Sequence, residues 1–387
     1  MNPLSEATSA RAPVDVPSPG YVGWRDSIKA GTLIWALSLF MASPPFSTWS
    51  QTNIANSRAA DYLRLCHDPL TRNLVESMLA YRISTPLLAW LLHLPEVAAL
   101  ALPYFFSLAA LVVIHRALVL RSDLGLASLA TVGVACSSTF LYTQGCLGIP
   151  DSLTHLGSAV AMIGSAPVAA FAILIGGLND ERAALALPFI ALWRYPKAVP
   201  FNYRTGSTWL ALARAIAPLA TGLAAALVVR HALTIGLLGD GISTPSLYRE
   251  IAKTVSELKP WLESWAVWFV NWLKGPGWLW LLLIPPFVSS RWRPAAFPIL
   301  ILGPAFLLVC ASTFIVADAA RSIGFAFPAA LLCCAWIYDR DPQAARKLTM
   351  IVASLQVITP ALWIYQRWEW LQFRPFPWEF WLFIHTR

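Results

Sequence analysis

The chain has 387 residues, of which 57% are hydrophobic and 12% are charged. Soluble domains carry about 25% charged residues, so this composition excludes an ordinary soluble protein and indicates a polytopic α-helical membrane protein. The net charge of +8 is typical of basic cytoplasmic loops that contact anionic lipid. No basic stripe alternates with surface aromatic residues, so we expect membrane lipids and no nucleic acid as partners.

The first predicted elements are an arm, a membrane span and a long outer loop. Residues 1–28 are polar and rich in Pro and Ser, which predicts a disordered cytoplasmic arm. The apolar run 29–43 is predicted to be a retained span, because no cleavage-site pattern follows it. The outer loop 44–95 contains an apolar stretch at 83–94 that is too short to cross a bilayer, so we expect a re-entrant or interfacial helix there.

Further apolar runs predict an all-α transmembrane bundle of about 10–11 spans over residues 29–365. Its remaining spans are expected at 96–119, 124–142, 151–165, 167–178, 182–193, 207–229, one of 261–273 and 277–289, 295–316, 322–338 and 348–365. The three runs between 151 and 193 are short of the ~20 residues that a crossing needs, so they must tilt, thin the bilayer or border a water-filled cavity.

Two further segments complete the predicted organisation. An outer segment over 230–275 is polar at its start, and the tail 366–387 is so rich in Trp and Phe that we expect an interfacial segment. The short loops HRALVLRSD, RYPKAVPFNYRTG, SRWRP and YDRDPQAARK are all basic. The positive-inside rule therefore places these loops and the N-terminus in the cytoplasm.

This orientation brings ionisable residues from separate chain segments to span ends on the outer side. Ionisable residues at membrane depth are rare and usually line a cavity or a functional path, so we expect one shared polar site. Its predicted members are Asp61, Asp68, Asp151, Asp180, Glu181, Arg182, Asp318 and Arg321.

The outer loop supplies the candidates for catalysis. Asp61 or Asp68 could act as a general base, although either could equally be a solvated carboxylate, and Asp68 could cap the helix that Pro69 begins. Tyr81 and Arg82 precede the short apolar stretch, where Arg82 could hold a phosphate bidentately or could reach towards the interface.

Two later span starts carry adjacent charges. Asp151 is well placed to cap its helix, and His155 lies one turn further, where an Asp–His pair could bind a metal or shuttle a proton and a buried, hydrogen-bonded His is the simpler alternative. Capping also accounts for Asp180 and Glu181. It does not account for Arg182, because a cation at a helix N-terminus is unfavourable, so Arg182 needs a carboxylate or an anionic ligand.

The stretch VADAARSIGFAFP repeats this pattern with Asp318 and Arg321, which are three residues apart and can pair. An anionic headgroup between the two helix starts would satisfy both Arg182 and Arg321. Cys66 and Cys146 both fall in outer loops, where they could form a disulfide or remain free thiols.

Several stretches together resemble the GT-C superfamily of polytopic glycosyltransferases that use polyprenyl-phosphate sugars. They are the first span followed by a long outer loop that carries acidic residues, YRISTPLLAWL, IPDSLTHL, GGLNDERAALALPFIALWR and ADAARSIGFAFP. The resemblance covers most of the chain in order, although each motif is short. The first outer loop departs from the family pattern, because Asp61 and Asp68 stand singly where many members have paired acidic residues.

The resemblance implies an enzyme of a bacterial inner membrane that transfers a hexosyl or pentosyl group from a polyprenyl-phosphate sugar to an acceptor on the outer face. Asp61 or Asp68 would be the base, and Tyr81, Arg82, Asp151, His155, Asp180, Glu181, Arg182, Asp318 and Arg321 would line the substrate site. Arg or Lys, or a divalent metal, would stabilise the leaving phosphate. The alternatives are a flippase or transporter of a lipid-linked or anionic substrate, and a non-catalytic subunit of an envelope polysaccharide system.

Overall fold

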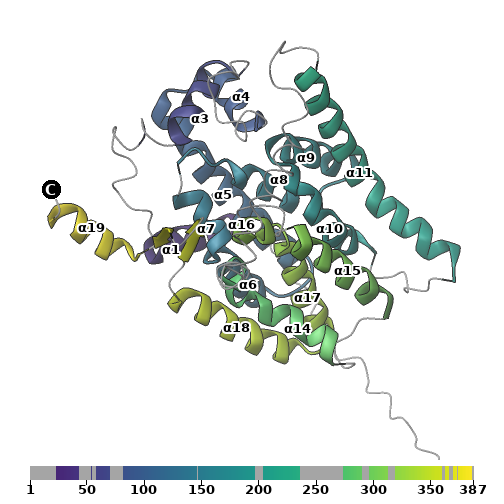
Figure 1. Cartoon of the computed structure of the whole chain (residues 1–387). Coiled ribbons are helices and arrows are strands. Elements are labelled where there is room, and N and C mark those ends of the chain that lie inside the picture. Colours follow the sequence, from purple (N-terminus) through teal and green to yellow (C-terminus); the bar gives the residue numbers. More distant parts are fainter. Residues whose placement is uncertain are drawn as a thin grey trace, which may run out of the picture.

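A computed structural model describes most of the chain (Figure 1). The described residues are 23–42, 54, 58–69, 82–145, 147–196, 204–235, 273–289, 296–312, 319–359, 362–365, 369–372 and 374–385. They are helical apart from one antiparallel hairpin, in which Leu362 pairs with Gln372 and Tyr365 with Glu369. The predicted helical class is therefore confirmed for this part of the chain.

The elements of the first half are α1 (Trp24–Met41), α3 (Arg58–His67), α4 (Ser84–Leu91), α5 (Glu96–Val119), α6 (Leu124–Ala135), α7 (Ser138–Gly145), α8 (Asp151–Ile163), α9 (Ala166–Asn179), the 3-10 helix η2 (Glu181–Ala186) and α10 (Leu187–Arg194). Those of the second half are α11 (Gly206–Ile235), η3 (Gly277–Leu279), α14 (Trp280–Val288), α15 (Ala296–Ser312), α16 (Ala319–Gly324), α17 (Phe327–Arg340), α18 (Pro342–Ile358), β1 (Leu362–Tyr365), β2 (Glu369–Gln372) and α19 (Phe376–His385).

Three helical stretches within the described residues are long and apolar enough to cross a membrane: Glu96–Val119, Gly206–Ala232 and Arg321–Arg340. A fourth is obtained if α6 and α7 form one span, although they are bent by 63° at the break between them. The other described helices are shorter or less apolar, so the larger predicted number of spans stays a prediction. The predicted last span also ends earlier than expected, because Thr359 is extended before Pro360.

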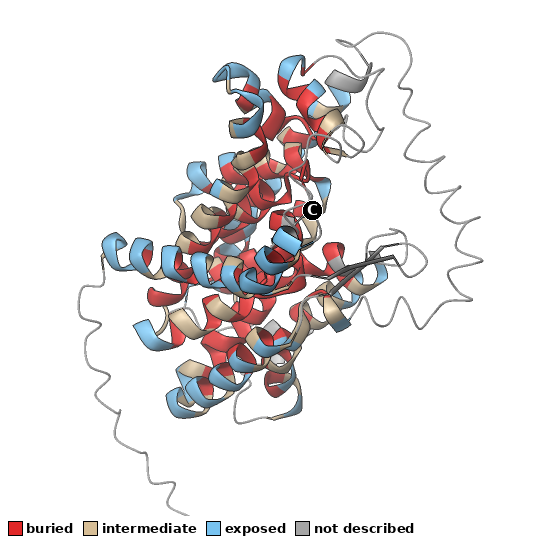
Figure 2. Cartoon of the chain, turned by 90° about the vertical axis from the view of Figure 1, so that its left-hand side faces the viewer, coloured by how far each residue is buried: buried red, intermediate tan, exposed pale blue. Residues whose placement is uncertain are grey.

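On several helices large apolar side chains face outwards and small or polar side chains face inwards, which is the reverse of the arrangement in a soluble protein. In α1 the buried face includes Ser27, Gly31 and Ser38, whereas Leu33 and Phe40 are 71% and 50% exposed. The buried residues fill the interior between the helices, and exposed residues cover their outer faces (Figure 2). An apolar outer surface with small and polar residues inside is suited to lipid rather than to water.

Polar contacts fix the directions in which the helices run. Asp123 caps the start of α6 and pairs with Arg346 near the start of α18 at 2.9 Å. At the other ends of the same two helices, Gln356 donates to the carbonyl of Cys136 at 2.9 Å. The side chain of Arg194 at the end of α10 donates to two carbonyls at the end of α8, where a cation complements the helix dipole. The starts of α6 and α18 therefore lie at one end of the bundle, and the ends of these two helices lie towards the other end.

The helices α8, α9 and α11 pack at backbone distance. A Cβ atom added at Gly157 would lie 2.6 Å from the carbonyl oxygen of Ala172, and one added at Gly222 would overlap the carbonyl oxygen of Ala170. Glycine at these contacts lets the backbones approach, as small residues do between membrane helices. This packing brings the start of α8 and the end of α9 to the same end of the bundle.

Candidate functional site

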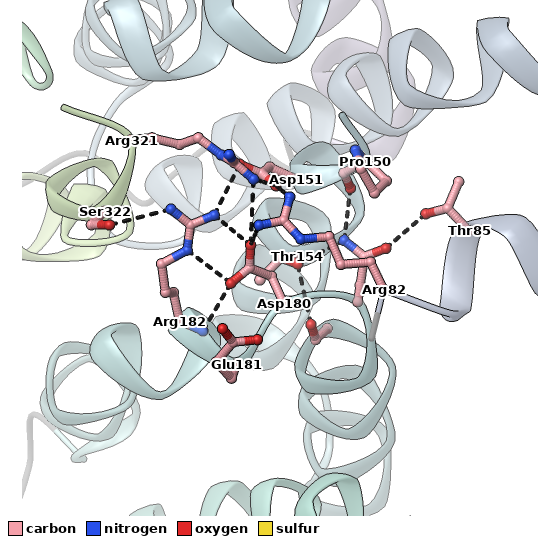
Figure 3. Close-up of polar contacts among 12 residues, drawn as sticks. Arg82, Thr85, Pro150, Asp151, Thr154, Asp180, Glu181, Arg182, Arg321 and Ser322 are labelled. Carbon is pink, nitrogen blue, oxygen red and sulfur yellow. Dashed lines mark hydrogen bonds and ion pairs between the residues drawn. The ribbon is translucent and has the colours of Figure 1, made fainter. Parts of the chain in front are cut away.

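Five charged side chains meet at that end of the bundle (Figure 3). Arg82 lies two residues before the start of α4, and Asp151 is the first residue of α8. Asp180 lies between α9 and η2, Arg182 lies in η2, and Arg321 lies in α16. We call these five residues the ion-pair network. The predicted convergence of separate span ends is thereby found for five of the predicted site residues.

Each carboxylate of the network contacts more than one guanidinium group. Both carboxylate oxygens of Asp180 accept hydrogen bonds from Arg182, at 2.9 Å and 2.5 Å, and Asp180 forms an ion pair with Arg82 at 3.2 Å. Both carboxylate oxygens of Asp151 accept hydrogen bonds from Arg321, and the one from Nη2 is 2.7 Å long. Asp151 also accepts a hydrogen bond from Arg82 at 3.1 Å. Arg82 therefore bridges the two carboxylates. A longer contact of 3.5 Å joins Arg182 to Asp151.

The network is almost entirely buried. The side chains of Asp151 and Asp180 are 0% exposed and that of Arg321 is 4% exposed, whereas those of Arg82 and Arg182 keep 10% and 11%. Burial alone would raise the pKa of the Asp180 carboxyl, but the guanidinium groups of Arg182 and Arg82 outweigh it and hold that pKa well below its usual range. Asp180 is therefore ionised at neutral pH.

Three guanidinium groups face two carboxylates, so the network has one excess positive charge within the described residues. An unbalanced buried charge is expensive, and an anion at the network would remove the imbalance. The Nε atom of Arg82 is buried without a hydrogen-bond partner among the described residues. The excess charge and this unused donor are both features that suit a bound anion.

The local sequence explains how the network is held in place. The Asp180 side chain accepts a hydrogen bond from the backbone N–H of Arg182 at 3.0 Å, so it caps η2 while it binds the guanidinium group. Arg182 also donates to Ser322 on α16 at 3.2 Å. The cap predicted from the sequence is confirmed, and the partner that Arg182 required is a neighbouring carboxylate.

Asn179 joins three of the four segments that carry the network, a role that the sequence analysis did not identify. Its amide nitrogen donates to the carbonyl of Pro150 at 2.7 Å and to Thr154 at 3.0 Å, and its amide oxygen accepts from Thr85 at 2.8 Å. It is 0% exposed. Its position directly before Asp180 was visible in the sequence, but its long-range partners were not.

Aromatic rings cover the guanidinium groups. The Arg182 guanidinium lies 5.1 Å from the ring centre of Phe325, and that of Arg321 lies 5.5 Å from the ring centre of Tyr142. Such contacts stabilise a cation in a site that excludes water. Neither aromatic residue was singled out from the sequence, because their proximity depends on how α7 and α16 pack together.

His155 is buried in an aromatic environment one turn beyond Asp151. Its ring stacks on Phe140 at 4.7 Å and lies 4.9 Å from the ring of Phe325. Neither ring nitrogen has a hydrogen-bond partner among the described residues, and the same holds for the Ser152 hydroxyl. His155 is therefore buried, as the simpler alternative expected, and Asp151 pairs with arginines rather than with His155.

The remaining predicted site residues have other surroundings. Glu181 is 53% exposed and pairs with Arg230 near the end of α11 at 2.6 Å, at the edge of the network. Asp61 accepts from Arg64 in the next turn of α3 at 3.2 Å, and its side chain is 24% exposed. Asp68 is exposed immediately after α3. Tyr81 and Asp318 lie outside the described residues.

The helix α3 is nevertheless anchored to the loop that delivers Asp151. Gly148 has a φ of +80°, and a Cβ atom there would lie 2.8 Å from the carbonyl oxygen of Arg58 and 2.9 Å from Ala59. Glycine is needed for both the conformation and the close approach. The helix that carries Asp61 therefore starts against the loop that precedes α8.

Two further predictions concern metals and cysteines. Across the residues that the structure describes, no group of three or more His, Cys, Asp or Glu side chains is arranged to hold a metal ion. Cys66 is a buried free thiol, and Cys146 lies outside the described residues.

Comparison with known proteins adds no relative. No protein-family model, curated protein or solved structure matches this chain. What the chain does must therefore be argued from the chemistry of the ion-pair network and from the motifs that carry it.

Proposed function

We propose that this protein is a membrane glycosyltransferase of the GT-C type that transfers a sugar from a polyprenyl-phosphate donor to an acceptor on the outer face of a bacterial inner membrane. The observation that carries the proposal is the ion-pair network, which among the described residues holds one more guanidinium group than carboxylates. A sugar phosphodiester lipid carries one negative charge, which would balance that excess.

The location of the network also supports a lipid substrate. Arg82 and Arg182 are the members that keep about a tenth of their side chains exposed, at 10% and 11%. A phosphate that approaches them from the membrane surface would meet planar guanidinium groups that suit bidentate phosphate recognition. The prenyl chain would remain in the bilayer beside the apolar outer faces of the helices.

In the proposed reaction, an acceptor hydroxyl attacks the anomeric carbon of the donor sugar. A new carbon–oxygen bond forms as the bond to the phosphate oxygen breaks, and the hydroxyl proton passes to a carboxylate. Asp151 and Asp180 are fully buried and each is held by more than one guanidinium group, so they are poor bases. Asp61, in contrast, is partly exposed and pairs with Arg64. Asp61 or Asp68 remains the proposed base, and Arg82, Arg182 and Arg321 would stabilise the negative charge on the leaving phosphate.

The proposal is tested by sugar transfer with purified protein in lipid nanodiscs, using a panel of polyprenyl-phosphate hexoses and pentoses. We expect one of Asp61→Asn and Asp68→Asn to abolish transfer while leaving donor binding unchanged. Transfer at the wild-type rate in both single variants and in the double variant would refute the assignment of the base. Movement of the intact donor across vesicle membranes without transfer would instead identify a flippase.

A further inference from the structure

The C-terminal helix α19 is apolar on its outside and acidic on its inside. Phe376, Trp378 and Trp381 are 42%, 54% and 49% exposed, whereas Glu379 is 6% exposed. The Glu379 carboxylate faces Arg374 at 3.7 Å. In water an amphipathic helix buries its apolar side chains and exposes its carboxylates, so this arrangement is the reverse of the expected one.

The exposed rings of α19 contact one another in two groups, which together form its aromatic surface. Phe376 stacks with Phe380 at 6.0 Å, Trp378 contacts Trp381 at 5.5 Å, and Trp381 stacks with His385 at 4.7 Å. Trp and aromatic rings with a polar edge favour the boundary between lipid and water, where the ring is in an apolar environment and its N–H can be hydrated. The chemistry of the surface thus fits a membrane interface.

The position of α19 in the bundle is fixed by α1. Phe376 at the start of α19 lies 6.5 Å from Phe40 near the end of α1, and α19 extends away from α1 at the left of Figure 1. The beginning of α1 is at the other end of the bundle, where Trp24 lies under Arg116 and Ser27 contacts His115 near the end of α5. The C-terminal helix and the start of α1 are therefore at opposite ends.

The end that carries α19 is also the end that carries the ion-pair network. Arg321 of the network lies over Tyr142 of α7. The helix α7 contacts α16, α1 and the strand β1 that leads towards α19. These contacts link the C-terminal hairpin and α19 to the network and not to the end where Asp123 pairs with Arg346.

We propose that α19 lies in the lipid–water interface on the same side of the membrane as the ion-pair network, opposite to the start of α1. Its aromatic surface would contact lipid headgroups and the adjoining acyl chains, while Glu379 stays against the protein. A lipid substrate that reaches the network from this side would pass through the leaflet that α19 contacts. The inference concerns topology and lipid contact, so it does not depend on the proposed reaction.

The first experiment measures the side of the membrane on which α19 lies. In a background without the six native cysteines, single cysteines replace Glu181 beside the network and Arg346 at the other end, both of which are 53% exposed. Sealed vesicles are treated with a membrane-impermeant maleimide, and a C-terminal epitope tag is probed in the same vesicles. We expect the tag and Glu181→Cys to be accessible from one side and Arg346→Cys from the other. A tag that is accessible only from the side on which Arg346→Cys is labelled would overturn the proposal.

The second experiment measures what covers the aromatic surface. A photo-crosslinking phenylalanine derivative is placed at Trp378 or at Trp381, with Glu379 as the matched inward position. In lipid nanodiscs we expect lipid adducts from the two outward positions and intramolecular crosslinks from Glu379. Crosslinks between two copies of the chain, or an equal absence of lipid adducts at all three positions, would contradict the proposal. Agreement in both experiments would stand even if no sugar were transferred.

Discussion

Asp180 and Arg82 make opposite contributions to the charge balance of the network, and this difference can be measured. Replacing Asp180 by Asn leaves three guanidinium groups with one carboxylate, whereas replacing Arg82 by Gln leaves two of each. Breaking a buried pair so that charge is left uncompensated costs about 3–5 kcal/mol. We therefore predict that Asp180→Asn lowers the free energy of unfolding by about that amount and that Arg82→Gln lowers it by less.

Thermal or detergent-induced unfolding of both variants checks this order, with Arg346→Gln as the control. Arg346 belongs to an exposed pair with Asp123, and exposed pairs contribute little to stability because water and salt screen them. A larger loss of stability in Arg82→Gln than in Asp180→Asn would show that the excess charge does not govern the network.

The same carboxylate predicts a pH dependence. The pKa of Asp180 is lower in the folded protein than its usual value, so its stabilising contribution is present above about pH 4 and is lost as pH falls through the lowered pKa. The stability difference between the wild type and Asp180→Asn should therefore be constant from about pH 5 to 8 and shrink in stronger acid. A difference that shrank on raising the pH instead would contradict the assigned ionisation.

The two buried histidines His155 and His115 have different surroundings and can be compared with each other. Both are 0% exposed, but the ring nitrogens of His115 contact Ser27 and Ser128 at 3.2 Å, whereas those of His155 have no partner among the described residues. A buried polar group without a hydrogen bond costs about 1–3 kcal/mol. We predict that His155→Phe raises the melting temperature and that His115→Phe lowers it.

Calorimetry or tryptophan fluorescence in detergent measures both melting temperatures. A decrease in His155→Phe comparable to that in His115→Phe would mean that the His155 ring is hydrogen-bonded in the native protein. An increase together with reduced donor binding would indicate that the polar ring is retained for substrate rather than for folding.

Among the elements, the contact between α9 and α11 depends on glycine. A Cβ atom at Gly222 would overlap the carbonyl oxygen of Ala170, whereas one at Gly206 at the start of α11 would meet nothing within 4 Å. Overpacking a close contact costs about 1–3 kcal/mol. We predict that Gly222→Ala destabilises the protein by about that amount and that Gly206→Ala leaves its stability unchanged or slightly increased, as measured by thermal unfolding.

The element boundaries show where sequence patterns stop being informative. The span 96–119 was predicted with the bounds of α5, because a long apolar run between a Pro and a polar loop has few alternatives. The run 124–142 was predicted as one span, but the structure divides it into α6 and α7 with a break after Ala135. No charged residue or Pro lies within residues 124–142, so no strong helix-breaking signal in the sequence marks that break.

At the scale of the whole molecule, topology predicted much of the site. Successive spans end on alternate sides of the membrane, and this rule was enough to place four charged residues on one side: Asp151, Asp180, Arg182 and Arg321. The structure brings their charged groups into contact. Capping rules also identified Arg182 as the residue that needed a partner. Which carboxylate it would bind was not readable, because Glu181 is adjacent in sequence but turns to Arg230.

The contacts that close the site could not be predicted from one sequence. Asn179 bonds to residues 29 and 94 positions earlier, and no local pattern specifies partners at such separations. The covering of Arg182 by Phe325 likewise arises from the packing of helices that are distant in the chain. Long-range side-chain contacts of this kind follow from the fold as a whole and not from periodicity or motif.

The proposed function requires the guanidinium groups of the ion-pair network to bind the phosphate of a polyprenyl lipid. Its most direct test compares the binding of polyprenyl phosphate and of the uncharged polyprenol to the protein in nanodiscs. A charge-assisted hydrogen bond contributes about 1.5–3 kcal/mol, which corresponds to roughly 10–100-fold in affinity. The account predicts that the wild type and Arg346→Gln prefer the phosphate by about that factor and that Arg82→Gln loses the preference. Equal binding of the two lipids by the wild type, or an undiminished preference in Arg82→Gln, would contradict it.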